Sequence, residues 1–211
     1  MTFQFFRPDE KPYGFTYGQW TVKWWQWLLG IAKDDNPALD DTGKNTAVEQ
    51  NNPNTWFLAG TFVGAKVPHR ICRLPAGKAI LFPTINYQAN FLEDPIFPGE
   101  SELKKHVYHD INDIAYNLAV LDGVNMPIYR VGSDPTLFPV RIAKGIPHGT
   151  NGNDEPILSV DDGLTNAVSD GYWVFLKPLP SGRHDLHLAG ACTGGKRRTE
   201  AYYHLTIEDA P

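Results

Sequence analysis

The sequence predicts a mainly β, single-domain antiparallel β-sandwich of the jelly-roll or immunoglobulin-like kind, formed by residues 1–211. Short apolar runs recur between turn signals along most of the chain, as in sandwiches and barrels. Glycine and proline number 19 and 17, which suits a fold with many turns. With 211 residues, 42% of them hydrophobic, the chain can bury a core without metals or disulfides.

An amphipathic helix is expected near the start, in TYGQWTVKWWQWLLGIA, residues 16–32. Thr16 can cap this helix, and Gln19 completes a capping box three residues later. Apolar residues then recur at helical spacing in a wide stripe that includes Trp20, Trp24, Trp25 and Trp27. Such a stripe favours packing against a sheet over an exposed aromatic platform. Because Trp25 lies beside the main tryptophan line, it is the one expected to reach a pocket.

Further elements follow from local patterns. Strands are expected in the apolar runs at 56–63, 70–75, 78–86, 128–131, 138–142 and 157–160. Pro83 marks an edge or an irregularity in the third run. A second helix is expected at 101–116, and Asp122-Gly123 beyond it predicts a hairpin turn. Three C-terminal runs predict antiparallel strands in a meander, within 171–178, 183–190 and 200–209.

Charge and hydropathy argue against two classes of partner. The net charge of −5 is unlike that of a nucleic-acid-binding protein, which usually carries a basic face. No apolar run approaches the roughly 20 residues of a membrane span. The first residues lack the pattern of a signal peptide, so the chain as written is expected to be cytoplasmic or the mature part of an exported protein. The sequence demands no cofactor and no particular oligomeric state.

Several blocks resemble a group of bacterial proteins of unknown function that often carry an export signal. The main blocks are YGFTYGQWTVKWWQW, WFLAGTF, RICRLPAGKAILFPTIN and SDGYWVFLKPLPSGRHDLHLAG. The resemblance implies one compact domain, favours export and brings no activity with it. Members of that group often carry a cysteine before WFLAGTF, able to pair with the counterpart of Cys72, and this chain has none there. Cys72 and Cys192 are therefore expected either as one long-range disulfide or as two free thiols.

The strongest candidate site is TINYQANFLED, residues 84–94, expected as a loop at the mouth of the sandwich. Its side chains could bind a carbohydrate or another small molecule, completed by two arginines of an expected neighbouring strand. The predicted binding residues are Trp25, Arg70, Arg73, Asn86, Tyr87 and Gln88. The favoured function is thus a non-catalytic binding or structural module. The alternative is a hydrolase or isomerase that uses Glu93 or Asp94 as acid or base, with or without a metal.

Other polar clusters carry weaker hypotheses. His187 and His204 could bind a metal if they meet across neighbouring strands, although a structural pair on the sheet is favoured. Helical spacing places four potential ligands on a solvent-facing side, namely His106, His109, Asp110 and Asp113. GACTGGKR at 190–197 resembles a phosphate-binding loop, but it joins two expected strands and has no Ser or Thr after Lys196. Its basic residues are expected to meet an anion only weakly.

Overall fold

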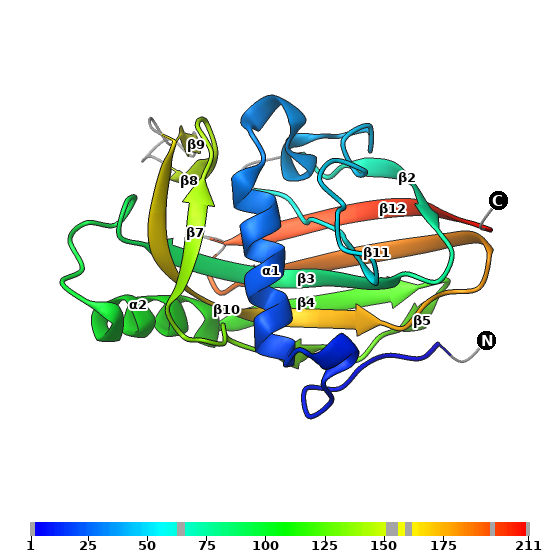
Figure 1. Cartoon of the computed structure of the whole chain (residues 1–211), viewed down its shortest axis with the longest axis horizontal. Helices are drawn as coiled ribbons and strands as arrows, with labels where there is room; N and C mark the ends of the chain where they lie inside the picture. The colour runs from blue at the N-terminus through cyan, green and yellow to red at the C-terminus, as the bar shows by residue number, and fades with distance from the viewer. Residues whose placement is uncertain (1–2, 63–65, 151–155, 159–161, 195–196, 210–211) are drawn as a thin grey trace.

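The computed structural model describes residues 3–62, 66–150, 156–158, 162–194 and 197–209 (Figure 1). Two five-stranded sheets form the body of the protein, and a two-stranded sheet joins β8 to β9. Sheet A has the strand order β1-β3-β10-β6, with β7 also paired to β10. Sheet B has the order β2-β12-β11-β4-β5. The described chain is therefore mainly β with two α-helices, as the sequence predicts.

The elements have the following bounds. Sheet A contains β1 (Thr55–Phe57), β3 (Ala79–Asn90), β6 (Tyr129–Arg130), β7 (Phe138–Ile142) and β10 (Gly163–Leu176). Sheet B contains β2 (His69–Pro75), β4 (Ile114–Leu121), β5 (Val124–Asn125), β11 (Gly182–Cys192) and β12 (Arg198–Glu208). The small hairpin consists of β8 (Pro147–Thr150) and β9 (Pro156–Leu158). The α-helices are α1 (Tyr17–Gly30) and α2 (Glu100–Asn112), and short 3-10 turns occur at Pro12–Gly14, Lys33–Asp35 and Pro37–Leu39.

Helix α1 begins as predicted. Thr16 Oγ1 accepts from the backbone N–H of Gln19 at 3.1 Å, and Gln19 Oε1 accepts from the backbone N–H of Thr16 at 2.9 Å. Both halves of the capping box therefore form. The apolar stripe packs on sheet A, where Trp20, Trp24 and Trp27 are buried. Each of these three indoles donates to a backbone carbonyl, those of Pro12, Leu58 and Val48 respectively.

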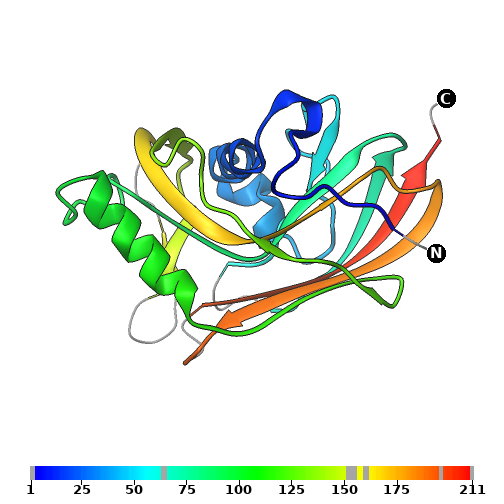
Figure 2. The same ribbon diagram turned by 90° about the horizontal axis from the view of Figure 1, so that it is seen from below.

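Sheet A is covered on both faces. Figure 2 shows α1 on one side of β3 and β10 and sheet B on the other. Because side chains alternate along a strand, β3 directs Leu81 toward α1 but Ile80 and Phe82 toward sheet B. In the same way, β10 directs Trp173 toward α1 and Val174 toward sheet B. The near-continuous apolar runs of these strands follow from this double burial.

Two strand pairs depart from the predicted antiparallel arrangement. Strand β1 is parallel to β3, and β2 is parallel to β12. The chain leaves sheet A after β1, forms β2 in sheet B and then returns to sheet A as β3. A return through another layer allows neighbouring strands to run in the same direction, which a tight hairpin does not.

The predicted C-terminal meander is wrong at one of its connections. Strands β11 and β12 pair antiparallel, but β10 belongs to sheet A and pairs with β3. The connection after β10 contains Pro178 and Pro180, which have no N–H to donate to a hairpin ladder. It carries the chain from one sheet to the other.

Residues 87–90, which lie in the predicted loop beyond the strand expected at 78–86, continue strand β3. The long strand β10 offers them an antiparallel partner, with Tyr87 opposite Asp170. The irregularity predicted at Pro83 is present, because the register of the pair shifts between Tyr172 and Trp173. The Asp122-Gly123 hairpin turn is also present, with φ angles of 49° and 77° between β4 and β5.

Other boundaries differ in smaller ways. The run predicted at 56–63 forms a strand only as far as Phe57, and β8 lies between the runs predicted at 138–142 and 157–160. The run at 157–160 contributes to β9 up to Leu158, and its last two residues lie outside the described residues.

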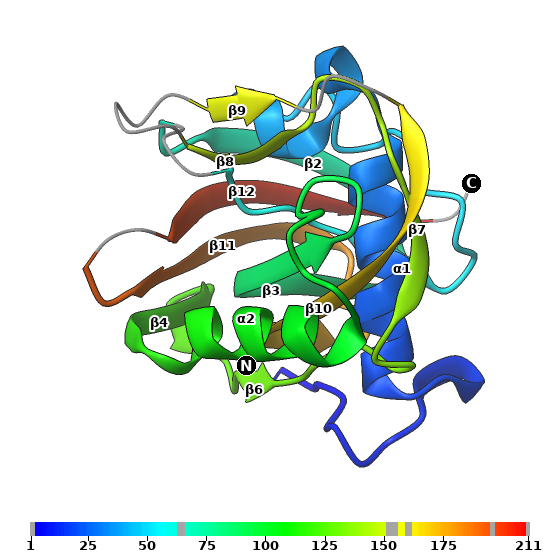
Figure 3. The same ribbon diagram turned by 90° about the vertical axis from the view of Figure 1, so that its left-hand side faces the viewer.

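Helix α2 lies across one end of the sheets, against β3, β10 and β11 (Figure 3). Its buried residues are Leu103, Val107 and Ile111, as the apolar line predicts. It ends at Asn112, before the predicted boundary, because the chain from Ile114 onward pairs with β11. Neither α-helix combines the length and apolarity that a membrane crossing requires, within the ranges that the structure describes.

Candidate functional site

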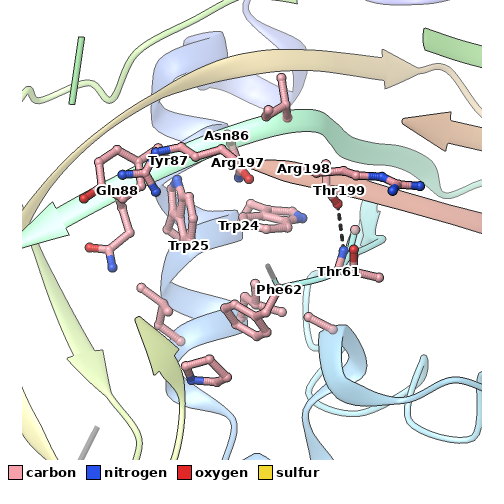
Figure 4. Close-up of a pocket in the computed structure, with 16 residues that line it drawn as sticks. Trp24, Trp25, Thr61, Phe62, Asn86, Tyr87, Gln88, Arg197, Arg198 and Thr199 are labelled. Carbon is pink, nitrogen blue, oxygen red and sulfur yellow. Dashed lines mark hydrogen bonds between the residues drawn. The ribbon is translucent and has the colours of Figure 1, made fainter. Parts of the chain in front are cut away.

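A pocket lies between α1, β3, the segment 59–62 and the start of β12 (Figure 4). Its volume is about 100 Å³, smaller than the roughly 150 Å³ of a cavity known to enclose benzene, so it could hold one ring with part of it in solvent. Aromatic side chains form much of its wall: Trp24, Trp25, Phe62 and Tyr87. These walls can enclose a flat molecule, because aromatic faces offer a large contact area with little flexibility.

Four of the predicted binding residues line this pocket together, namely Trp25, Asn86, Tyr87 and Gln88. Trp25 comes from α1, and the other three are consecutive residues of β3. They meet because α1 packs on the sheet to which β3 belongs. The sequence therefore identifies the residues of one wall, although it assigns them to a loop rather than a strand.

Two buried nitrogen atoms of lining residues have no hydrogen-bond partner among the described residues. They are Nε1 of Trp25 and Nδ2 of Asn86. In Figure 4 the indole nitrogen of Trp25 is turned toward the side of the pocket that Tyr87 and Gln88 line. An unpaired buried donor costs about 1–3 kcal/mol, so native proteins rarely keep one without a reason.

The polar end of the pocket carries two arginines. The guanidinium of Arg197 lies 3.3 Å from the centroid of the Tyr87 ring, and its Nε donates to Asp110 of α2 at 3.2 Å. Arg198 donates to Glu200 at 2.9 Å, and this hydrogen bond lowers the pKa of the Glu200 carboxyl. Both arginines line the pocket, whereas neither carboxylate is among the described lining residues. Arg198 and Glu200 flank the inward-facing Thr199, so the Arg198 guanidinium lies with its partner on the outer face of sheet B, whereas the Arg197 guanidinium lies on the ring of Tyr87.

Helix α2 supports Tyr87 from the other side. The Tyr87 hydroxyl lies 3.0 Å from Nε2 of His106, whose ring stacks on Phe97 at 4.8 Å. Burial raises the pKa of Tyr87 to about 12, so the phenol keeps its proton at neutral pH. The solvent-facing position predicted for His106 and Asp110 is wrong. A helical wheel predicts which side of α2 packs on the sheets. It does not predict that Tyr87 and Arg197, from a strand and a loop nearby, contact the polar residues next to that side.

Arg70 and Arg73 do not line the pocket, contrary to the prediction. Their strand β2 belongs to sheet B and is not a neighbour of β3. Arg70 is fully buried and donates to three backbone carbonyls at 2.7–3.0 Å, those of Asp40, Ala59 and Gly60. Arg73 is exposed and donates to Glu208 at 2.9 Å. Arg70 thus holds the segment whose next residues form a pocket wall, while Arg73 lies toward the far end of β12.

Glu93 and Asp94 follow β3, outside the set of described residues that line the pocket. Asn90 Nδ2 donates to the Glu93 carboxylate at 2.6 Å, and the Asn90 backbone N–H donates to Asp94 at 3.3 Å. The Asp94 backbone N–H in turn donates to the carbonyl of Asn90 at 2.9 Å. These contacts bind both carboxylates to the turn that closes the end of β3.

His187 and His204 lie on the outer face of sheet B within a row of rings. His187 stacks on Tyr202 at 4.0 Å, Tyr202 on His69 at 4.6 Å, and His69 on His204 at 6.0 Å. Two rings thus stand between the proposed metal ligands. Each histidine instead meets a carboxylate, since His187 lies 3.0 Å from Glu200 and His204 lies 2.7 Å from Asp185. In the described ranges, no three His, Cys, Asp or Glu side chains are placed to hold a metal.

The two cysteines are free thiols in different cores, Cys72 between the sheets and Cys192 beside α2. Burial raises the pKa of Cys72 from 9.0 to about 11, and the thiolate is the reactive form. We expect an alkylating reagent near neutral pH to leave Cys72 unmodified until the protein is unfolded, as peptide mass spectrometry would show.

The raised pKa also predicts the sign of a pH effect. The unfolded chain loses the Cys72 proton at lower pH than the folded chain, so the contribution of the neutral thiol to stability is complete below about pH 9 and falls toward pH 11. A Cys72→Ala variant should lack this part of the alkaline decline in unfolding midpoint. Rapid alkylation of Cys72 in the folded protein would contradict the buried placement.

Functional evidence for this chain rests on the pocket. Its walls combine aromatic faces, two unpaired buried nitrogens and two arginines, all from segments far apart in the sequence. The basic residues near Arg197 and Arg198 are those predicted from the sequence to meet an anion weakly. Lys196, in the same loop, lies outside the described residues. Comparisons with protein-family models, curated proteins and solved structures found no match to this chain.

Proposed function

We propose that this protein is a non-catalytic binding module that holds a small ring-containing molecule between α1 and β3. The observation that carries this proposal is the pair of unpartnered nitrogens, Trp25 Nε1 and Asn86 Nδ2, beside aromatic walls. Both nitrogens are covered in this structure, so ligand oxygens would supply the missing hydrogen-bond partners after a small shift of the side chains that form the pocket wall. A sugar ring or an aromatic ring would supply the flat face that Trp25 and Phe62 can contact. Concave, largely apolar sites with a few oriented polar groups are typical of small-molecule binding.

The ionisable groups of the pocket favour binding over catalysis. General acid or base catalysis needs a group whose pKa lies near the working pH. Among the described lining residues, the ionisable side chains are Tyr87 and the two arginines. Burial raises the pKa of Tyr87 to about 12, and arginine stays charged in proteins. Each of these groups can donate a hydrogen bond, and none exchanges its proton readily at neutral pH.

The indole N–H signals in a ¹H–¹⁵N spectrum test the proposal directly. The chain has six tryptophans, and a Trp25→Phe variant identifies the signal of Trp25 by its loss. We expect glucose, glucuronate, benzamide or benzoate to move this signal in a saturable manner. The signal of Trp20, which is buried and bonded to Pro12, should stay in place.

Asn86→Ala should weaken binding of the same probe about 3- to 10-fold, the effect of one lost hydrogen bond. Its melting temperature should stay close to that of the parent, because the deleted amide nitrogen has no partner to lose among the described residues. Asn125→Ala makes the same change at an exposed position of β5 and should leave binding unchanged. If none of the four probes moves the Trp25 signal, the proposal fails.

A further inference from the structure

The lining of the pocket points to a narrower class of ligand, an inference that rests on the proposed function. We infer that the bound ring is aromatic and is not a sugar. An aromatic ring presents carbon on both faces and needs few hydrogen-bond partners. A sugar carries a hydroxyl on most of its ring carbons, and each hydroxyl both donates and accepts. The polar groups that the pocket can offer to a ligand therefore decide between the two.

Apolar side chains from separate segments form much of the pocket wall. In addition to the indoles of Trp24 and Trp25 and the ring of Phe62, the apolar lining residues are Leu28, Leu29, Ala38, Ile85 and Pro147. In Figure 4 Phe62 lies on one side of the two indoles and Tyr87 lies on the other. These surroundings favour a ligand whose faces are apolar, because removing such faces from water stabilises the complex.

The threonines and the buried indole N–H of the pocket bond to the protein itself. Thr199 Oγ1 accepts from the backbone N–H of Thr61 at 2.7 Å, and Thr61 Oγ1 accepts from the backbone N–H of Glu200 at 3.3 Å. The indole N–H of Trp24 donates to the carbonyl of Leu58 at 2.9 Å. These bonds hold the segment 59–62 against β12 and α1, and they use hydrogen-bonding capacity that a sugar would need.

The polar side chains of β3 are engaged in the same way. The Tyr87 hydroxyl lies 3.0 Å from Nε2 of His106. Gln88 Nε2 donates to Glu93 at 3.4 Å, and Gln88 Oε1 accepts from Nδ2 of Asn90 at 3.2 Å. Both ends of the Gln88 amide therefore have partners at the end of β3, away from the aromatic part of the lining.

The unpaired nitrogens are too few to receive a sugar. Trp25 Nε1 and Asn86 Nδ2 are both donors, and both are covered in this structure. After a small shift of the wall they can meet an acceptor oxygen on one ring substituent. The hydroxyls of a sugar that entered the pocket would leave water without gaining a partner. Each such loss lowers the affinity about ten-fold.

The four probes used above form two charge-matched pairs, benzamide with glucose and benzoate with glucuronate. Dissociation constants come from the Trp25 indole signal and from calorimetry. Because the net charge is the same within a pair, attraction to the arginines does not decide the comparison. In each pair that binds, we expect the aromatic member to bind at least about ten-fold tighter than the sugar.

A substitution in the aromatic wall tests where the ring lies. Phe62→Ala should weaken benzamide binding about 3- to 10-fold, the effect of one lost aromatic contact. Phe15→Ala removes a partly exposed ring that is not among the described lining residues, and it should leave benzamide binding unchanged. The probe comparison uses the unaltered protein, so a folding defect of Phe62→Ala would not affect it.

The outcomes separate this inference from the function on which it rests. An aromatic preference below ten-fold, or a preference for the sugar, in any pair that binds overturns the inference and leaves the proposed binding function intact. Equal benzamide affinities of the folded Phe62→Ala and Phe15→Ala variants place the ring away from the aromatic wall and also overturn it. If no probe moves the Trp25 signal, both proposals fail.

Discussion

Replacing Arg70 with alanine is expected to lower the free energy of unfolding by about 3–5 kcal/mol, because several buried acceptors lose their donor. The side chain is fully buried, and its Nη1 also donates to the hydroxyl of Tyr203 at 2.7 Å. Alanine would leave the carbonyls of Asp40 and Gly60 without this donor, at a cost of about 1–3 kcal/mol for each buried group left unpaired. Alanine also removes the cost of burying a cation, and this gain offsets part of the loss. The gain is smaller than the combined cost of the carbonyls that are left without a donor.

Urea or thermal unfolding followed by circular dichroism would measure the change. Arg73→Ala is the matched control, because Arg73 lies three residues further along the same strand with its side chain in solvent. It should change the free energy of unfolding by less than about 1 kcal/mol. Arg70→Met fills most of the volume and should recover little stability if the orphaned carbonyls dominate. Equal stabilities of the Arg70 and Arg73 variants would contradict the structural role given to Arg70.

Trp24→Ala is expected to cost a similar amount, about 3–5 kcal/mol, for a different reason. Trp24 is 2% exposed and has three indole neighbours, with ring centroids 4.9 Å from Trp25, 5.2 Å from Trp173 and 6.0 Å from Trp27. Alanine would leave a large cavity between α1 and sheet A, because these bulky rings cannot all move to fill it. It would also remove the indole N–H that donates to Leu58 at 2.9 Å.

Two further substitutions, measured in the same unfolding experiment, separate the cost of the cavity from the cost of the lost hydrogen bond. Trp24→Phe keeps a ring and loses the hydrogen bond, so its destabilisation should be about 1–3 kcal/mol. Gln26→Ala changes an exposed residue of the same helix and should cost less than about 1 kcal/mol, including its bond to Pro139. If Trp24→Ala were no worse than Gln26→Ala, the tryptophan stripe would not be a core element.

The features predicted best from the sequence are those determined by nearby residues. The capping box of α1 needs only Thr16 and Gln19, and its apolar stripe needs only helical spacing. The hairpin turn at Asp122-Gly123 likewise depends on the left-handed backbone that these two residue types tolerate. Each feature is confirmed because its cause lies within a few residues of the chain.

The features predicted poorly depend on partners far along the chain. Polar residues such as Asn86 and Gln88 indicate a loop by composition, yet β10 pairs with them through Gly171 and Ser169. Strand β10 pairs with β3, which lies more than 70 residues earlier in the chain, and no local pattern expresses that choice over a hairpin with β11.

Some residues of the candidate site can likewise be identified from the sequence, and others depend on distant partners. Trp25 and the β3 residues stand out by type and lie together in the pocket. No pattern in the sequence marks Thr61 and Phe62 as lining residues, although the resemblance in WFLAGTF covers that segment. Helical spacing alone predicts Asp110 on the surface, because its partner Arg197 belongs to a loop whose position a sequence pattern does not specify.

The order of strands in the sheets has a consequence for synthesis of the chain. Helix α1 ends at Gly30 and β10, against which its tryptophans pack, begins at Gly163, so the helix leaves the ribosome well before that strand. At roughly 5–20 residues per second, the apolar face of α1 waits on the order of 10 s for that strand. The tryptophan face of α1 is therefore covered in two stages, first by Phe57 and Leu81 and only later by Trp173 and Phe175 of β10.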